Sequence, residues 1–195
     1  MRLFIALDID EEIHERINRF VDGVRNFAPD ARWMSPESMH VTLKFIGEQP
    51  EDALPSIKQS LMEVSAPAGD IHFQGYGFFP TPKSARVFWV GTESGPELPA
   101  LAALIDKQTA AVGIPREERA FSPHLTLARS AGGSGAPHRN KHDGGSRTFQ
   151  KLQERLAALP TPEFGTMRPH EFFLYQSQLS PKGSKYTKLA SFALR

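Results

Sequence analysis

The chain has 195 residues, of which 39% are apolar, and this is enough for the core of one domain or of two small lobes. The formal net charge of +1 provides no overall field to hold nucleic acid, so phosphate recognition would need a local cluster. Cysteine is absent, which excludes disulfides, thiolate metal sites and cysteine nucleophiles.

The N-terminal apolar run ends at Asp8, too soon for a signal peptide. No run elsewhere approaches the ~18 apolar residues that a membrane-spanning helix needs. We therefore expect a cytoplasmic globular protein with no membrane partner.

The first half of the chain alternates predicted strands and helices. Its hydrophobic periods predict a strand over residues 3–9, a helix from Asp10 to before Pro29, a strand over 39–45, a helix over 54–64 and a strand over 71–79. Gly75 and Gly77 interrupt the last strand, which indicates a bend or the close approach of another segment.

The second half repeats this pattern. Residues 87–90 match residues 3–6 at an offset of 84, and the offset becomes 95 after a glycine-rich, basic insertion at residues 131–146. Two further strands are expected over 171–178 and 185–194.

Neither half has enough residues to form a stable hydrophobic core of its own, so the halves are expected to pack about a pseudo-twofold axis. The predicted fold class is α+β: a bilobal arrangement of two antiparallel-rich sheets, flanked by helices around a central cleft. We expect one two-lobed domain over residues 1–195. Its repeats span about 1–84 and about 85–195, and the lobes could exchange their terminal strands.

One short motif occurs in both halves, as His40-x-Thr42-x and, 84 residues later, as His124-x-Thr126-x. Successive side chains of a strand alternate between its faces, so each histidine shares a face with its threonine while the apolar neighbours face a core. One such motif is also what any half-buried strand looks like, but two copies in matched repeats indicate a site. Imidazole titrates near ~6.5, so two imidazoles at one pocket can serve as base and acid. Pseudo-symmetric histidines would lie on opposite sides of a substrate, as an in-line displacement at phosphorus requires.

The chain resembles the two-histidine phosphoesterase family, and most closely its bacterial RNA 2′,3′-cyclic phosphodiesterases, once called 2′-5′ RNA ligases. The residues that carry the resemblance are 2–7, 32–33, 39–48, 121–129 and 174–179, followed by Gly183 and Tyr186. The insertion at 131–146 is the main departure from the short connection expected in the family. It is either a tolerated surface insertion or a mobile arm that meets RNA phosphates.

The resemblance implies an enzyme that hydrolyses an RNA 2′,3′-cyclic phosphate to a 2′-phosphate without a metal ion or other cofactor. By analogy, His40 would donate a proton to the leaving ribose oxygen and His124 would accept one from water, although the motifs alone leave this order open. Thr42 and Thr126 would bind the non-bridging phosphate oxygens, and Arg129 would neutralise developing charge.

The sequence also indicates how other residues near the motifs are placed. By strict alternation Arg129 points away from the histidine of its strand, so its role requires a twist or bulge. Lys44 has the right parity to join the site, but a lysine at a strand end is usually solvated. His14 is also expected to be solvated. Most aromatic residues, Phe79 and Trp89 among them, are expected in the core, with one or two lining the cleft as base-stacking platforms.

The expected partner is an RNA with a 2′,3′-cyclic phosphate terminus, or a small cyclic nucleotide, and we expect a monomer. No cluster of histidine and carboxylate residues has metal-ligand spacing, so no metal is expected. One alternative is 2′-5′ RNA ligation as the main activity, in which a 5′-hydroxyl replaces water. Another is a non-catalytic RNA-end or nucleotide-binding module, which would leave two matched histidines without a purpose.

Overall fold

The computed structural model describes residues 1–130, 147–180 and 183–195, so the inserted segment at 131–146 lies outside the described residues. One sheet has the strand order β3-β1-β8-β9, with β1 at Arg2–Leu7, β3 at Val41–Glu48, β8 at Glu171–Ser180 and β9 at Gly183–Ala193. The other has the order β2-β6-β5-β4-β7, with β2 at Arg32–Trp33, β4 at Ile71–Phe79, β5 at Val87–Ser94, β6 at His124–Arg129 and β7 at Glu163–Met167. All of these pairings are antiparallel.

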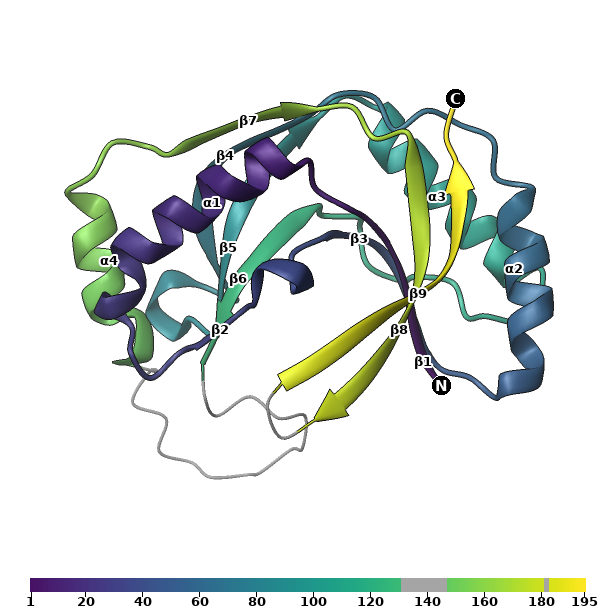
Figure 1. The fold of residues 1–195 in the computed structure, drawn as a ribbon, viewed down its shortest axis with the longest axis horizontal. Helices are drawn as coiled ribbons and strands as arrows, with labels where there is room; N and C mark the ends of the chain where they lie inside the picture. The colour runs from purple at the N-terminus through teal and green to yellow at the C-terminus, as the bar shows by residue number, and fades with distance from the viewer. Residues whose placement is uncertain (131–146, 181–182) are drawn as a thin grey trace.

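Helices cover both sheets (Figure 1). The α-helices of the described residues are α1 at Glu11–Val24, α2 at Leu54–Met62, α3 at Glu97–Ala110 and α4 at Gln150–Ala157. α1 and α4 lie beside the five-stranded sheet, whereas α2 and α3 lie beside the four-stranded sheet (Figure 1). The predicted α+β class, with two antiparallel sheets flanked by helices, is confirmed.

Sheet membership does not follow the boundary between the halves. β4 comes from the first half but pairs with β5 of the second, and β8 comes from the second half but pairs with β1 of the first. The series β3-β1-β8-β9 therefore corresponds to β6-β5-β4-β7, strand for strand. The helices cross over as well, because α1 contacts β7 and α4 while α3 contacts α2 and β3.

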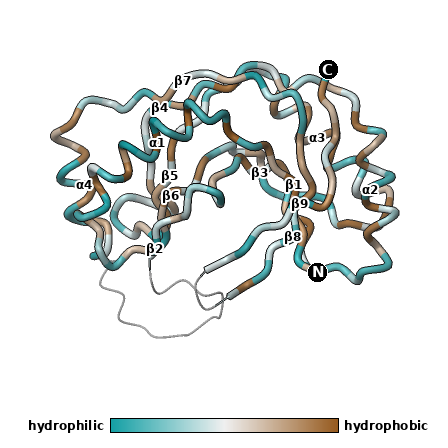
Figure 2. The backbone as a smooth tube through the Cα atoms, viewed as in Figure 1, coloured by the Kyte–Doolittle hydropathy of each residue, from teal (hydrophilic) through white to brown (hydrophobic). Residues whose placement is uncertain are grey.

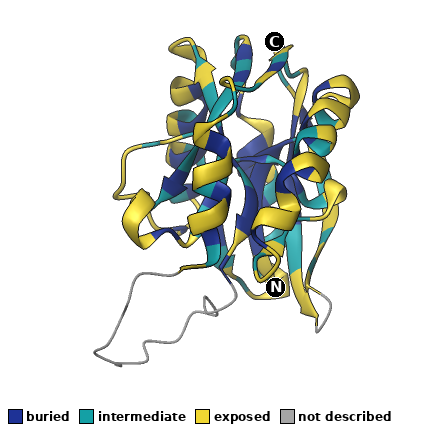
Figure 3. Cartoon of the chain, turned by 90° about the vertical axis from the view of Figure 1, so that its left-hand side faces the viewer, coloured by how far each residue is buried: buried dark blue, intermediate teal, exposed yellow. Residues whose placement is uncertain are grey.

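The apolar pattern of the sequence is buried as expected. In α1 the residues Ile13, Ile17, Val21 and Val24 recur at helical spacing and are buried, which fixes the face that α1 turns to the sheet. One apolar core joins both halves and includes Ile5 and Phe88, each with no exposed surface. Apolar stretches of the tube coincide with the strands and inner helix faces, and the buried positions lie between exposed outer helices (Figures 2 and 3).

Two details differ from the prediction. β7 was not expected, because it has only five residues and includes Gly165, whose φ of +117° is unusual for a strand. The repeat offset in the first strand of each half is 83 rather than 84, because Ala6 lies opposite Thr42 and Trp89 lies opposite Thr126. Phe4 and Phe88 match in residue type at an offset of 84, but they belong to opposite faces of their sheets.

No helix of the described residues is long and apolar enough to cross a membrane.

Candidate active site

The two motifs lie on strands that meet between the sheets. His40 immediately precedes β3, His124 is the first residue of β6, and the two strands contact each other although they belong to different sheets. Each histidine bonds to the backbone of the serine two residues before it: His124 Nδ1 donates to the Ser122 carbonyl at 2.9 Å, and His40 bonds to the backbone of Ser38. Since a carbonyl oxygen only accepts, His124 carries a proton on Nδ1 and leaves Nε2 available to a substrate.

Both motif strands contain a β-bulge directly after the threonine. The pairing register shifts at Leu43 in β3 and at Leu127 in β6, which are 84 residues apart. A bulge adds one residue to a strand, so side chains beyond it change face relative to strict alternation. The two halves therefore share a backbone irregularity as well as a motif.

The bulge in β6 settles the direction of Arg129. Arg129 lies opposite Val87, and Thr126 lies opposite Trp89. Because Val87 and Trp89 are two residues apart on one strand, they share a face, and so do Arg129 and Thr126. The exposed Arg129 guanidinium is thus on the motif side of the sheet, as its predicted role requires.

The bulge in β3 has the opposite consequence for Lys44. The expectation that Lys44 shares the histidine face, or is solvated, was wrong: Lys44 is only 5% exposed and lies opposite Ile5 on the core side. Its Nζ donates to the Asp106 carboxylate of α3 and, at 2.9 Å, to the Pro115 carbonyl. The exposed Phe45 occupies the motif side instead, at the position that Arg129 has in the other half.

His40 is enclosed by aromatic rings. Phe4 stacks on it at 4.8 Å between ring centroids, Tyr175 at 5.9 Å, and Tyr186 approaches edge-on at 5.2 Å. Burial lowers the pKa of His40 to about 4, although the charge of Asp8 and the bond to the serine backbone oppose this shift. At pH 7 His40 is therefore a neutral imidazole.

His124 has its own aromatic neighbours. Phe79 approaches it edge-on at 5.2 Å, and Trp89 lies at 6.3 Å and stacks on Phe79 at 5.0 Å. The Trp89 indole covers Gly77 so closely that a Cβ built on this glycine would come within 2.0 Å of it. The expected close approach at Gly77 is confirmed, and Phe79 and Trp89 are aromatics that line the motif side instead of the core.

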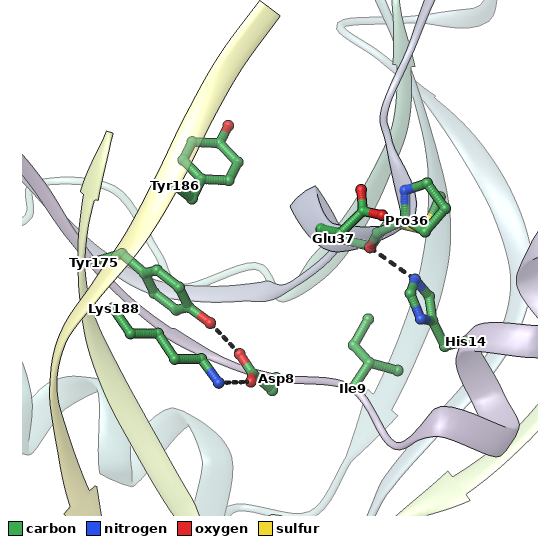
Figure 4. Close-up of a pocket in the computed structure, with 9 residues that line it drawn as sticks. Asp8, Ile9, His14, Pro36, Glu37, Tyr175, Tyr186 and Lys188 are labelled. Atoms are coloured by element: carbon green, nitrogen blue, oxygen red, sulfur yellow. Dashed lines mark hydrogen bonds and ion pairs between the residues drawn. The ribbon is translucent and has the colours of Figure 1, made fainter. Parts of the chain in front are cut away.

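A pocket lies beside the aromatic rings that enclose His40, and Tyr175 and Tyr186 line it (Figure 4). Asp8, at the end of β1, accepts hydrogen bonds there from the Tyr175 hydroxyl and from Lys188 Nζ. His14 also lines the pocket: its side chain is partly exposed, in line with the expectation that it is solvated, and its Nε2 donates to the Pro36 carbonyl at 2.7 Å.

Asp8, Tyr175, Tyr186 and Lys188 were not identified as site residues from the sequence. The last three lie on β8 and β9, some 135 residues or more from His40 in the sequence. Only the exchange of β8 into the first sheet brings them to the histidine, and no local pattern signals that exchange. Tyr175 and Tyr186 do belong to segments that carry the family resemblance, which was the one available signal.

No group of three or more histidine, aspartate or glutamate side chains within the described ranges could hold a metal ion.

Comparison with known proteins agrees with this arrangement. The family described as LigT-like phosphoesterase matches residues 7–89. A Methanothermobacter thermautotrophicus protein named RNA 2′,3′-cyclic phosphodiesterase is 31% identical over 196 residues, which cover 100% of this chain and 99% of the relative. The crystal structure of a Thermus thermophilus protein is 30% identical with a TM-score of 0.76, covering 100% of this chain and 98% of that chain. Escherichia coli LigT complexed with 3′-AMP is 26% identical with a TM-score of 0.75, covering 99% and 97%. The chain belongs to the LigT-like phosphoesterase family.

Proposed function

We propose that the protein hydrolyses the 2′,3′-cyclic phosphate at an RNA end to a 2′-phosphate, with His40 and His124 as a general acid–base pair and without a metal ion. The observation that carries the proposal is the matched placement of two Ser-x-His-x-Thr segments on contacting strands. The Methanothermobacter thermautotrophicus relative is named for this activity, and Escherichia coli LigT is described in complex with a ribonucleotide.

In the proposed reaction the cyclic phosphate lies between the two motif strands. The hydroxyls of Thr42 and Thr126 donate to its non-bridging oxygens, and Arg129 adds positive charge from the same face. His124 Nε2 takes a proton from water, the water oxygen attacks phosphorus, and the bond to the 3′ oxygen breaks on the opposite side. His40 then protonates that oxygen.

His40 must hold a proton to act as this acid. Burial disfavours its charged form, but an anionic phosphate at van der Waals contact favours the imidazolium, and Asp8 acts in the same direction. Substrate binding would therefore bring about protonation of His40, whereas His124, with Nδ1 already protonated, is ready to accept on Nε2.

The test uses a short RNA with a 2′,3′-cyclic phosphate, incubated with the protein in excess EDTA. The expected product has gained one water and carries a 2′-phosphate. A longer, joined product would instead support ligation as the main activity, and retained binding without any change of the end would support a binding module. Complete loss of turnover in EDTA that one added metal restores would overturn the metal-independent mechanism.

A further inference from the structure

Arg32 is a second arginine on the motif side of the five-stranded sheet. It lies directly opposite Arg129 in the pairing of β2 with β6 (Figure 1). Residues directly opposite each other in an antiparallel pair present their side chains on one face, so Arg32 shares the face of Arg129. The next residue, Trp33, supports this placement, because it lies opposite the buried Ala128 and its ring is 6.0 Å from that of the core residue Phe88.

The backbone around β2 holds Arg32 in a fixed position. The Trp33 indole donates to the Ala28 carbonyl at 3.1 Å, and the Met34 amide donates to the Leu127 carbonyl at 2.8 Å, which continues the pairing beyond β2. The Cβ atoms of residues directly opposite on antiparallel strands are about 4.5–5.5 Å apart. Arg32 and its partner in β6 are both exposed, so their guanidinium groups can reach the same anion.

Two arginines in direct opposition are unfavourable on their own. Like charges opposite each other destabilise a sheet, and among the described residues neither Arg32 nor Arg129 has an acidic partner at salt-bridge distance. Departures from such local rules are expected at functional sites. A guanidinium group binds phosphate through two parallel hydrogen bonds, so a phosphate is the ligand that this pair of charges fits.

Charge is distributed unevenly along the motif side of this sheet. On β6 the motif side runs from His124 at one end to Arg129 at the other. Gly91 of β5 lies opposite His124, and the exposed Glu93, two residues further along β5, faces the same side. The carboxylate repels an RNA backbone at the histidine end, whereas the two arginines attract it at the other end. An RNA held at the motifs is therefore expected to extend past Arg129 and Arg32.

The spacing along β6 matches the step from one phosphate to the next. Thr126 and Arg129 lie opposite Trp89 and Val87, which are two residues apart on β5, and two strand residues span about 6.6 Å. Successive phosphates of a nucleic-acid strand are separated by one sugar, a comparable distance. With the cyclic phosphate at Thr126, the next phosphate of the chain lies at the level of Arg32.

We propose that Arg32 binds the phosphodiester immediately 5′ to the nucleotide that carries the cyclic phosphate. The protein then favours the ends of RNA chains over 2′,3′-cyclic mononucleotides, which lack this phosphodiester. Arg32 is a substrate-binding residue and not a catalytic one, since it lies one strand away from the motif of β6. The inference rests on the proposed function.

The experiment compares two dinucleotides that end in the same 2′,3′-cyclic phosphate and differ only in the internal linkage, a phosphodiester in one and a neutral methylphosphonate in the other. For the wild-type protein we expect kcat/KM for the phosphodiester to be higher by at least ~10-fold, the low end for a hydrogen bond to a charged group. In Arg32→Gln this ratio should fall toward one. Arg19→Gln is the matched control: it removes the same charge from an exposed position on α1, the helix packed on the core side of the sheet, and should keep the wild-type ratio.

Binding of the two corresponding products, which carry a terminal 2′-phosphate, is measured by calorimetry and needs no turnover. Tighter binding of the phosphodiester product that Arg32→Gln weakens supports the subsite even if no cyclic phosphate is hydrolysed, in which case only the proposed activity fails. Equal hydrolysis and equal binding of the two linkages by the wild-type protein would overturn the subsite while the proposed activity stands. A preference that Arg32→Gln leaves unchanged would overturn the role of Arg32.

Discussion

His40 and His124 occupy matched positions in the two halves but have different surroundings. His40 lies among Phe4, Tyr175 and Tyr186, whereas His124 is fixed by a carbonyl and flanked by Phe79 and Trp89. Enclosure disfavours the charged form of His40, so its role as acid depends on the bound phosphate, whereas the bond to the Ser122 carbonyl leaves Nε2 of His124 available to accept a proton. The motif backbone is therefore pseudo-symmetric, whereas the surroundings of the two histidines differ.

The first prediction concerns how much each motif residue contributes to the rate of hydrolysis. His40→Ala and His124→Ala should each lower single-turnover hydrolysis of a cyclic-phosphate RNA by at least ~10²-fold, the usual contribution of a positioned acid or base. Thr42→Val and Thr126→Val should cost less, because each removes one hydrogen bond and keeps the shape of the strand.

The double histidine variant should be little slower than either single variant, since both groups act in one displacement. Circular dichroism of each variant controls for folding. A near-wild-type rate in either single variant would refute the assignment, and strictly multiplicative losses would show that the two histidines act in separate steps.

The second prediction links His40 to acid stability. Its pKa of about 4 lies below the ordinary value of 6.5, so between these two values the unfolded chain binds more protons than the folded protein. The contribution of His40 to the free energy of unfolding is fully present above pH 6.5 and is lost as the pH falls toward 4. The loss amounts to at most roughly 3 kcal/mol.

Urea unfolding at pH 7, 5.5 and 4 measures this effect. His40→Gln keeps a polar side chain that does not titrate, so its free energy of unfolding should fall less over the same range. Parallel pH dependence in wild type and His40→Gln would mean that the burial of His40 does not disfavour its charged form.

At the scale of the element, the bulges at Leu43 and Leu127 decide which side chains each motif strand presents. They turn Phe45 and Arg129 to the motif side and turn Lys44 to the core. Strict alternation predicts the histidine and threonine of each motif correctly, because these residues precede the bulge. It fails beyond the bulge, since a bulge depends on pairing with the neighbouring strand, which the strand's own sequence does not specify.

The third prediction tests the support of Trp89 by Gly77. A methyl group at Gly77 would overlap the indole, so Gly77→Ala must displace Trp89 from its contacts with Phe79 and His124. We expect a loss of about 1–3 kcal/mol in unfolding free energy, as for other overpacked sites, together with altered tryptophan fluorescence and slower turnover.

Gly23→Ala is the matched control, because a Cβ at Gly23 meets nothing within 4 Å. Gly23 lies inside α1, where alanine is favoured by roughly 0.5–1 kcal/mol, so this variant should be as stable as wild type or more stable. Wild-type fluorescence and stability in Gly77→Ala would contradict the close contact.

At the scale of the whole molecule, a buried ion pair joins the two halves behind the site. Lys44 of β3 meets Asp106 of α3, which also accepts from Arg116 and, at 2.9 Å, from the backbone amide of Glu117. Burial alone would raise the pKa of Asp106, but the bonds from Lys44, the amide and Arg116 hold it below its usual value. The carboxylate thus anchors the segment that leads to His124.

The fourth prediction compares the two cations that share this carboxylate. Lys44→Met leaves Asp106 without its buried partner and should lower the free energy of unfolding by roughly 3 kcal/mol. Arg116→Met removes a side chain that is 62% exposed and should cost no more than about 1 kcal/mol. Chemical denaturation of both variants measures the difference, and equal losses would contradict the dominant role of the buried pair.

Patterns in the sequence are enough to predict the class of the fold, the repeat and the paired motifs. These follow from local rules: apolar residues at helical spacing in α1, alternation in the strands, and His40 and His124 on equivalent strands. The close approach at Gly77 was also visible, because a glycine inside a strand often marks a place where another segment lies against the backbone.

The surroundings of the two motifs could not be predicted from the sequence. The exchange of β4 and β8 between the sheets carries Tyr175 to His40, and two bulges place Arg129 on the motif side and Lys44 in the core. Both depend on pairing between segments far apart in the chain. The free energy of such pairing comes from the burial of whole faces at once, and no single segment of the sequence contains that information.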